Sequence, residues 1–287
     1  TGVHGFAIRC VTTPPTRRPV VRFLYQRGLG RATPDLERKA DVNRCPSVEG
    51  VASVGQRKLT ILTDSVVLTD MSQYSDRRVM MVDTQVRPSD VTKFPVIEAM
   101  LNVPRENFVP DALREVAYMG ENVDLGNGRV LLDPRTMGKM LDALDVQPDD
   151  VVLDIGCGLG YSSALLARMS DAVVAVEDNA ELAAEAQRLL SEVGADNAAV
   201  FEGDLAEGAA KHGPYDAIVV QGAVEDFPSS LAAQLKEGGR AVCIFAEGAL
   251  GVVRVGHKMG DVMNWRDAFN ATAPVVKGFE TKKLFTL

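Results

Sequence analysis

The feature that most constrains the fold is a strand–helix alternation that begins after residue 150 and carries a glycine-rich loop at its first turn. Continuous apolar runs predict strands at 151–155, 172–176, 198–202, 217–220 and 241–245, and amphipathic patterns predict helices at 161–169, 180–193 and 229–235. Apolar strands alternating with helices indicate a mostly parallel sheet covered on both faces, which is a doubly wound α/β fold. Residues 251–287 add two or three further strands.

The glycine loop, Gly156-Cys157-Gly158-Leu159-Gly160, directly follows the first predicted strand. Ligands of doubly wound sheets bind at the carboxyl ends of the strands, and glycine lets the backbone turn sharply and approach a ligand closely. A dinucleotide fingerprint needs its third glycine where Tyr161 stands, so a nicotinamide cofactor is a remote alternative. Asp154, just before the loop, would repel a pyrophosphate and suits a cationic ligand. S-adenosylmethionine fits this, because it carries an ammonium and a sulfonium and no phosphate.

Two acids follow the next two predicted strands. Glu177 lies 21 residues after Gly156, where an acid accepts hydrogen bonds from both ribose hydroxyls; the alternative is a helix cap. Asp204 is placed to accept a hydrogen bond from an adenine amino group, and the alternative is a turn aspartate. Cys157 is either a small residue packed beneath the cofactor or a reactive thiol.

Residues 71–147 are predicted to form an N-terminal helical cap with a substrate loop, before a core of residues 148–287. A short helix is expected at 89–101, interrupted or started afresh at Pro95. A second helix has Asp133 as its N-cap and Pro134 as its first residue. Its apolar residues recur at helical spacing, so it buries one face: Met137, Met140, Leu141 and Leu144.

Residues 1–70 differ in composition from the rest of the chain. They hold eleven Lys and Arg against six Asp and Glu, whereas residues 71–287 hold twenty against thirty-three. Their cations are nine Arg and two Lys, and the first methionine of the chain is Met71. One interpretation is an Arg-rich targeting segment, although the stretch is long and contains acids. The favoured one is a basic extension that is not native or is disordered.

The cysteine and histidine content, the apolar runs and the net charge argue against several classes of site and partner. The four cysteines are scattered without a CxxC pair and the chain has three histidines, so we expect no metal site and no disulfide framework, and a cytoplasmic location. No apolar run reaches the roughly 20 residues that span a bilayer. The net charge of −8 argues against nucleic acid as a partner.

A series of segments resembles the protein-L-isoaspartate O-methyltransferase family across about residues 89–245. They are NVPRENFVP, AYMGENVDLGNGRVLLDP, VLDIGCGLGY, VVAVE, EGDLAEG, PYDAIVV and QLKEGGR. The resemblance implies a Rossmann-like class I methyltransferase fold with an N-terminal helical cap. It also implies methyl transfer from S-adenosylmethionine to the carboxylate of L-isoaspartyl residues in damaged proteins, by a monomer. The implied cofactor contacts are Asp154, Gly156, Cys157, Gly158, Gly160, Glu177 and Asp204.

The substrate loop departs from the family pattern, Gly-x-Gly-Gln-Thr-Ile-Ser-Gln-Pro. Val130 and Leu132 replace its two hydroxyl residues, and Leu132 stands at the family's active-site hydroxyl. Arg129 replaces the glutamine; it would clamp an anionic acceptor or, alternatively, be a solvated loop arginine. Tyr118 is retained, and the resemblance implies that it contacts the substrate. Two alternatives therefore stay open: a related enzyme acting on a different carboxylate or small molecule, and a non-catalytic module that binds S-adenosylmethionine.

Overall fold

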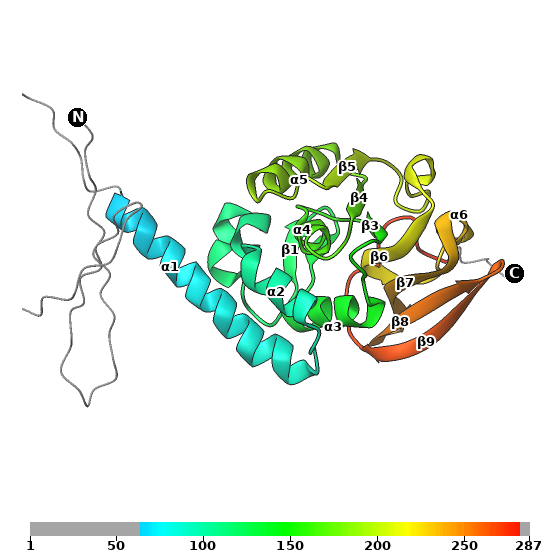
Figure 1. The fold of residues 1–287 in the computed structure, drawn as a ribbon, viewed down its shortest axis with the longest axis horizontal. Coiled ribbons are helices and arrows are strands. Elements are labelled where there is room, and N and C mark those ends of the chain that lie inside the picture. The colour runs from blue at the N-terminus through cyan, green and yellow to red at the C-terminus, as the bar shows by residue number, and fades with distance from the viewer. Residues whose placement is uncertain (1–63, 249, 282–287) are drawn as a thin grey trace, which may run out of the picture. The chain divides into compact units, whose positions relative to one another are not determined.

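The computed structural model of the protein describes residues 64–248 and 250–281 (Figure 1). The predictions for residues 1–63 lie outside the described residues. The first described helix, α1, spans Asp64–Met81, so the expected boundary after residue 70 falls inside a helix. In the described part, no helix is both long and apolar enough to cross a membrane.

Short helical segments follow α1 and build the N-terminal cap. They are η1 (Val82–Val86), η2 (Arg87–Ser89), α2 (Phe94–Asn102), η3 (Arg105–Phe108) and η4 (Asp111–Val116). Helix α2 has Lys93 as its N-cap and Pro95 in its first turn, where a missing N–H costs nothing. The new helical start at Pro95 is therefore confirmed, but the predicted start at residue 89 is wrong, because η2 ends at Ser89 and residues 90–93 are not helical.

A two-stranded hairpin connects the cap to the next helix. Strands β1 (Val123–Gly126) and β2 (Arg129–Leu131) pair antiparallel, and neither was predicted. Gly126, Asn127 and Gly128 all have positive φ at the turn, a conformation that glycine and asparagine tolerate. Helix α3 (Pro134–Leu144) follows, and the Asp133 carboxylate accepts the Thr136 N–H at 2.9 Å, so the predicted cap is confirmed. The four predicted apolar residues of α3 are all buried.

The core is a seven-stranded sheet with the order β5-β4-β3-β6-β7-β8-β9. Its strands are β3 (Val151–Ile155), β4 (Ala172–Glu177), β5 (Ala198–Glu202), β6 (Tyr215–Val224), β7 (Leu235–Glu247), β8 (Leu250–Met259) and β9 (Val262–Asn270). Strands β3 to β7 pair parallel, and β8 and β9 pair antiparallel. The chain leaves β3 toward β4 on one side and reaches β6 on the other, so the switch point lies at the carboxyl end of β3.

Hydrophobic cores lie on both faces of the sheet. Val152 of β3 belongs to the core that includes α2 and α3, whereas Leu153 and Ile155 belong to the opposite core. The linking helices are α4 (Tyr161–Ala167), α5 (Ala180–Glu192), η5 (Ala210–His212) and α6 (Ser229–Gln234). Figure 1 shows α4 and α5 near the cap, and α6 beside β7 at the other end of the core. The predicted doubly wound, mostly parallel fold with extra C-terminal strands is confirmed.

The extents of several elements differ from the predictions. Strands β6 and β7 are longer than predicted, because their pairing resumes, after shifts of register, beyond the polar and glycine residues that interrupt the apolar pattern. Helix α4 ends at Ala167 rather than at residue 169. After β9 the chain returns to the sheet, where Val275 forms an isolated parallel bridge with Ala223.

Candidate functional site

The glycine loop forms the tight turn from β3 into α4. Gly156, Gly158 and Gly160 have φ values of +72°, +57° and +91°, which residues with a side chain rarely adopt. The Gly156 N–H donates to the Val176 carbonyl at 2.8 Å, which ties the loop to the end of β4. A Cβ at Gly160 would lie 3.3 Å from the Ala186 Cβ, so this glycine also lets α4 approach α5. The loop therefore lies at the carboxyl edge of the sheet, as predicted.

Asp154, at the end of β3, is fully buried and satisfied by neutral donors. Its Oδ2 accepts hydrogen bonds from Ser162 Oγ and Ser163 Oγ, both at 2.6 Å, and its Oδ1 accepts from Gln221 Nε2 at 2.8 Å. Burial raises the pKa of Asp154, and the three donors oppose the shift. These contacts make Asp154 an anchor that joins β3, α4 and β6 beneath the loop.

Glu177, at the end of β4, is also fully buried and holds the glycine loop from the other side. Its Oε2 accepts the Gly158 N–H at 2.8 Å, and its Oε1 accepts the Asp178 N–H at 3.1 Å. The cap of α5 is Asn179, whose side chain accepts from the Glu181 and Leu182 N–H groups, so the alternative of a helix cap for Glu177 is wrong. Burial raises the pKa of Glu177, and the Arg129 charge opposes the shift.

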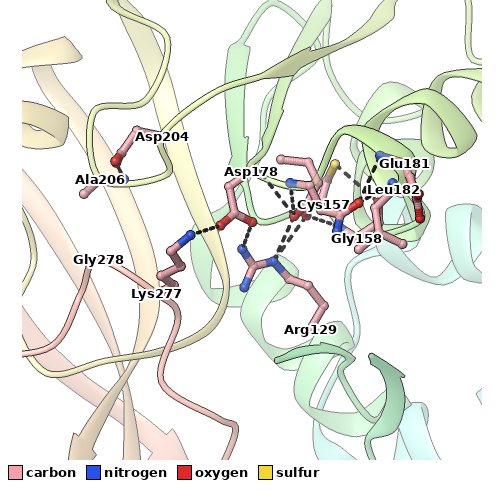
Figure 2. Close-up of polar contacts among 12 residues, drawn as sticks. Arg129, Cys157, Gly158, Asp178, Glu181, Leu182, Asp204, Ala206, Lys277 and Gly278 are labelled. Carbon is pink, nitrogen blue, oxygen red and sulfur yellow. Dashed lines mark hydrogen bonds and ion pairs between the residues drawn. The ribbon is translucent and has the colours of Figure 1, made fainter. Parts of the chain in front are cut away.

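Arg129 pairs with this acidic strand end. Its Nε lies 3.1 Å and 3.3 Å from the two Glu177 carboxylate oxygens, and its Nη2 lies 2.5 Å from Asp178 Oδ1. The Arg129 side chain is 3% exposed, so the alternative of a solvated loop arginine is wrong. Lys277 Nζ lies 3.3 Å from the other Asp178 oxygen, and Figure 2 shows Arg129 and Lys277 on two sides of Asp178. Burial favours a raised pKa for Asp178, but Glu177, Arg129 and Lys277 together lower it.

A cavity of about 340 Å³ opens next to this network, between the ends of β4 and β5. Asp204 lines it, and its Oδ1 accepts the Ala206 N–H at 2.9 Å, so this residue is both a turn aspartate and part of the cavity wall. The remaining lining residues are Asp178, Glu202, Gly203, Leu205, Lys277 and Gly278. The volume is that of a small-molecule pocket.

The space beside the glycine loop is much smaller and has both apolar and polar lining residues. It measures about 10 Å³, and Val130, Leu132 and Cys157 are among its lining residues. Leu132 is 1% exposed, and its backbone carbonyl accepts a hydrogen bond from Arg105 Nη2 at 2.7 Å. Arg105 also donates to the Ala117 carbonyl at 2.6 Å, which connects the hairpin to the cap.

The two remaining predicted site residues are buried and paired within the protein. The Tyr118 hydroxyl donates to a Glu106 carboxylate oxygen and accepts from Arg78 Nε at 3.1 Å. Burial raises the pKa of the Tyr118 hydroxyl, and the Glu106 carboxylate adds to this shift. Burial also raises the pKa of the Cys157 thiol well above its usual range, which fits a packing residue better than a reactive thiol.

Two residues of the site, Asp178 and Lys277, were missed. Asp178 follows the predicted acid immediately, and its position next to Glu177 was an available signal. Lys277 comes from the segment after β9, and no motif connects it to Asp178, 99 residues earlier. Among the residues that the structure describes, no cluster of three or more His, Cys, Asp or Glu side chains is arranged to hold a metal ion.

A mostly parallel sheet with this strand order, a glycine loop after its first core strand and a buried acid at the end of its second is typical of a Rossmann-like class I methyltransferase fold. A family model described as protein-L-isoaspartate(D-aspartate) O-methyltransferase matches residues 78–267. The chain belongs to this family.

Individual relatives agree with the family match. The chain is 40% identical over 172 residues to a protein-L-isoaspartate O-methyltransferase of Syntrophus aciditrophicus strain SB, covering 60% of this chain and 79% of that protein. It is 39% identical over 173 residues to one from Koribacter versatilis strain Ellin345, covering 60% and 78%.

Solved structures share the fold. A putative protein-L-isoaspartate O-methyltransferase from Plasmodium falciparum, solved with S-adenosyl-L-homocysteine, superposes with a TM-score of 0.61 at 19% identity, over 71% of this chain and 98% of that one. A second protein-L-isoaspartate O-methyltransferase gives 0.61 at 22% identity, over 71% and 66%.

Proposed function

We propose that this protein transfers the methyl group of S-adenosylmethionine to the carboxylate of L-isoaspartyl residues in damaged proteins, which is a repair reaction. The observation that carries the proposal is family membership across residues 78–267, a range that includes the glycine loop, Glu177 and Asp204. The relatives in S. aciditrophicus and K. versatilis carry the name of this activity.

The acceptor groups at the carboxyl edge of the sheet fit the adenosine part of this cofactor. The 340 Å³ cavity has room for a nucleoside, and Asp204 offers a carboxylate to an amino group there. Glu177 would hold the ribose hydroxyls, and the glycine loop would receive the amino-acid part. The proposed cofactor contacts remain Asp154, Gly156, Cys157, Gly158, Gly160, Glu177 and Asp204.

The proposed chemistry makes small demands on the protein. When bound, S-adenosylmethionine supplies an electrophilic methyl group on a sulfonium, and the acceptor carboxylate is already a nucleophile. The chain therefore needs to align the two and exclude water, without a strong general base. The apolar walls around Leu132 and Val130 support water exclusion. Arg129 and Tyr118 are the proposed acceptor contacts, and because both are buried and paired, that role requires the hairpin or the cap to move.

The test is methyl transfer from labelled S-adenosylmethionine to an isoaspartyl peptide, with the matching aspartyl peptide as control and the full chain as enzyme. We expect base-labile label, as a methyl ester gives, on the isoaspartyl peptide alone. Label on neither peptide, with the cofactor bound, would contradict the proposed acceptor. Absence of cofactor binding would contradict the proposal as a whole.

A different carboxylate or small-molecule acceptor is the second candidate, and the substrate loop favours it. Val130 and Leu132 offer no hydroxyl where the family pattern has two, and both residues line the space beside the glycine loop. Loss of one hydrogen-bond donor at a reacting centre costs on the order of 10²–10³ in rate. Transfer to a small carboxylic acid in preference to the isoaspartyl peptide would establish this candidate. Cofactor binding without transfer to any acceptor would instead indicate a non-catalytic module.

We further propose a cytoplasmic monomer with a helical cap at 71–147 and a cofactor-binding core at 148–287. Two buried free thiols in the described part, Cys157 and Cys243, fit a reducing compartment. The acidic net charge supports a protein or small-molecule acceptor over a nucleic acid. Light scattering of the purified chain tests the monomer, and cell fractionation tests the location.

A further inference from the structure

The β1–β2 hairpin lies directly on the glycine loop. An added Cβ at Gly158 would come within 2.8 Å of Leu125 Cδ1, and one at Gly156 would lie 3.7 Å from Arg129 Nε. The space left beside the loop is about 10 Å³, which is room for about one water molecule. The amino-acid part of a bound S-adenosylmethionine therefore needs volume that Leu125 and Arg129 fill.

A second overlap between the hairpin and the cofactor occurs at Glu177, the proposed partner of the ribose hydroxyls. Arg129 Nε donates to Glu177 at 3.1 Å, and the carboxylate also accepts the Gly158 N–H at 2.8 Å. Glu177 is fully buried, so it has no solvent-facing side to offer to a second set of donors. A ribose diol can bond to Glu177 only by replacing the Arg129 guanidinium.

We infer that Arg129 is a positioning residue that occupies the ribose position on Glu177 and holds the hairpin closed until the cofactor replaces it. This inference rests on the proposed function. Replacement of Arg129 by the ribose couples cofactor binding to acceptor binding. The reason is that the released hairpin carries Val130 and leads into Leu132 at the proposed acceptor site. The glutamine of the family pattern is neutral and cannot form this ion pair, so the coupling is a property of this chain.

The neighbouring charges make the exchange feasible. A buried ion pair is costly to break when one charge is left without a partner. Here Asp178 keeps Lys277 at 3.3 Å after Arg129 leaves, and Lys277 is 82% exposed and free to follow the carboxylate. Glu177 keeps the N–H groups of Gly158 and Asp178 and gains the ribose hydroxyls. Arg129 itself moves toward solvent, where a guanidinium is well hydrated.

Calorimetric binding of S-adenosylhomocysteine to the full chain and to Arg129→Gln tests the inference. Removing the competing closed state raises the fraction of protein that can bind, so we expect a Kd about tenfold lower in the variant. Arg188→Gln, which removes an exposed arginine on α5, is the matched control and should leave the Kd unchanged. A Kd that is equal or higher in Arg129→Gln overturns the inference. Absence of binding by the wild type and the variants alike overturns the proposed function itself.

Hydrogen exchange of the wild-type chain gives a second readout that does not depend on a variant. S-adenosylhomocysteine should speed exchange of the hairpin amides between Val123 and Leu131 while slowing exchange in the glycine loop. Slower exchange in both segments would mean that the ligand binds beneath a closed hairpin, and the inference would be wrong.

Discussion

Asp154 and Glu177 are two fully buried carboxylates on either side of the glycine loop, and the structure satisfies them in different ways. Asp154 accepts hydrogen bonds from neutral side chains, Ser162, Ser163 and Gln221. Glu177 accepts backbone N–H groups and pairs with Arg129, which belongs to a separate hairpin. Neutral donors packed on adjacent elements hold Asp154 in place, whereas the Glu177 partner comes from the β1–β2 hairpin, which forms a sheet separate from the core sheet. The difference indicates that Asp154 supports the loop and Glu177 exchanges partners.

The largest expected effect is on stability at Asp154. Asp154→Ala leaves three buried donors without acceptors, so we expect the free energy of unfolding to fall by about 3 kcal/mol. Asp154→Asn keeps an acceptor for the serines and should cost about 1 kcal/mol. Urea unfolding followed by circular dichroism measures both values. Equal losses in the two variants would contradict the anchoring role.

Glu177→Gln should act mainly on ligand binding. The neutral amide accepts weaker hydrogen bonds from ribose hydroxyls than the carboxylate does, so we expect the Kd for S-adenosylhomocysteine to rise about 10- to 100-fold. The loss of stability should be smaller than in Asp154→Ala, because Asp178 still pairs with Arg129. Calorimetry gives the Kd and urea unfolding gives the stability. A variant with unchanged affinity but a large loss of stability would reverse the roles assigned to the two acids.

Asp154 and Asp178 should respond to pH in opposite directions. Burial raises the pKa of Asp154 above its ordinary value of 3.8, so its stabilising contribution is present below pH 3.8 and is lost as the pH rises through the native pKa. The pKa of Asp178 is lowered, because Glu177, Arg129 and Lys277 outweigh its burial; its contribution is present above pH 3.8 and is lost as the pH falls through the native pKa.

Relative to the wild type, Asp154→Asn should therefore gain stability with rising pH and Asp178→Asn should lose it. Urea unfolding of the three proteins across the acid range measures this contrast. The same sign of change in both variants would show that the two carboxyl groups have similar surroundings.

The smallest effect is expected at Lys277. Its ion pair with Asp178 is largely exposed, so Lys277→Ala should change the free energy of unfolding by less than about 1 kcal/mol. If Lys277 stabilises Asp178 after Arg129 leaves, the variant should also bind S-adenosylhomocysteine slightly more weakly. The control is Lys211→Ala, which removes a lysine from η5, and its affinity should match that of the wild type.

Local sequence patterns predicted the parts of the fold that depend on neighbouring residues. The apolar run of β3, the turn glycines after it and the Asp133–Pro134 start of α3 each lie within a few positions of the contacts that they form. The positions of Glu177 and Asp204 at the ends of predicted strands placed both acids at the carboxyl edge of the sheet, and the family resemblance agreed with that placement. The β1–β2 hairpin was missed because its strands have four and three residues, too few to show an alternating pattern.

The partners of Arg129 could not be predicted because they depend on contacts between distant segments. The residue lies 48 positions before Glu177, and the loop pattern alone gave a clamp for an acceptor or a solvated side chain. Which of its possible partners it meets is decided by the hairpin packing on the glycine loop, through Leu125 and Gly158. The sequence indicates that a buried arginine will pair with a carboxylate, but the tertiary contacts of the fold determine which carboxylate that is.

A crystal structure of the full chain with S-adenosylhomocysteine tests the central claim most directly. The account predicts that the ribose hydroxyls donate to the Glu177 carboxylate and that Arg129 has left it, with the hairpin displaced from Gly156 and Gly158. Arg129 still paired with Glu177 in a complex whose nucleoside lies elsewhere would contradict the account.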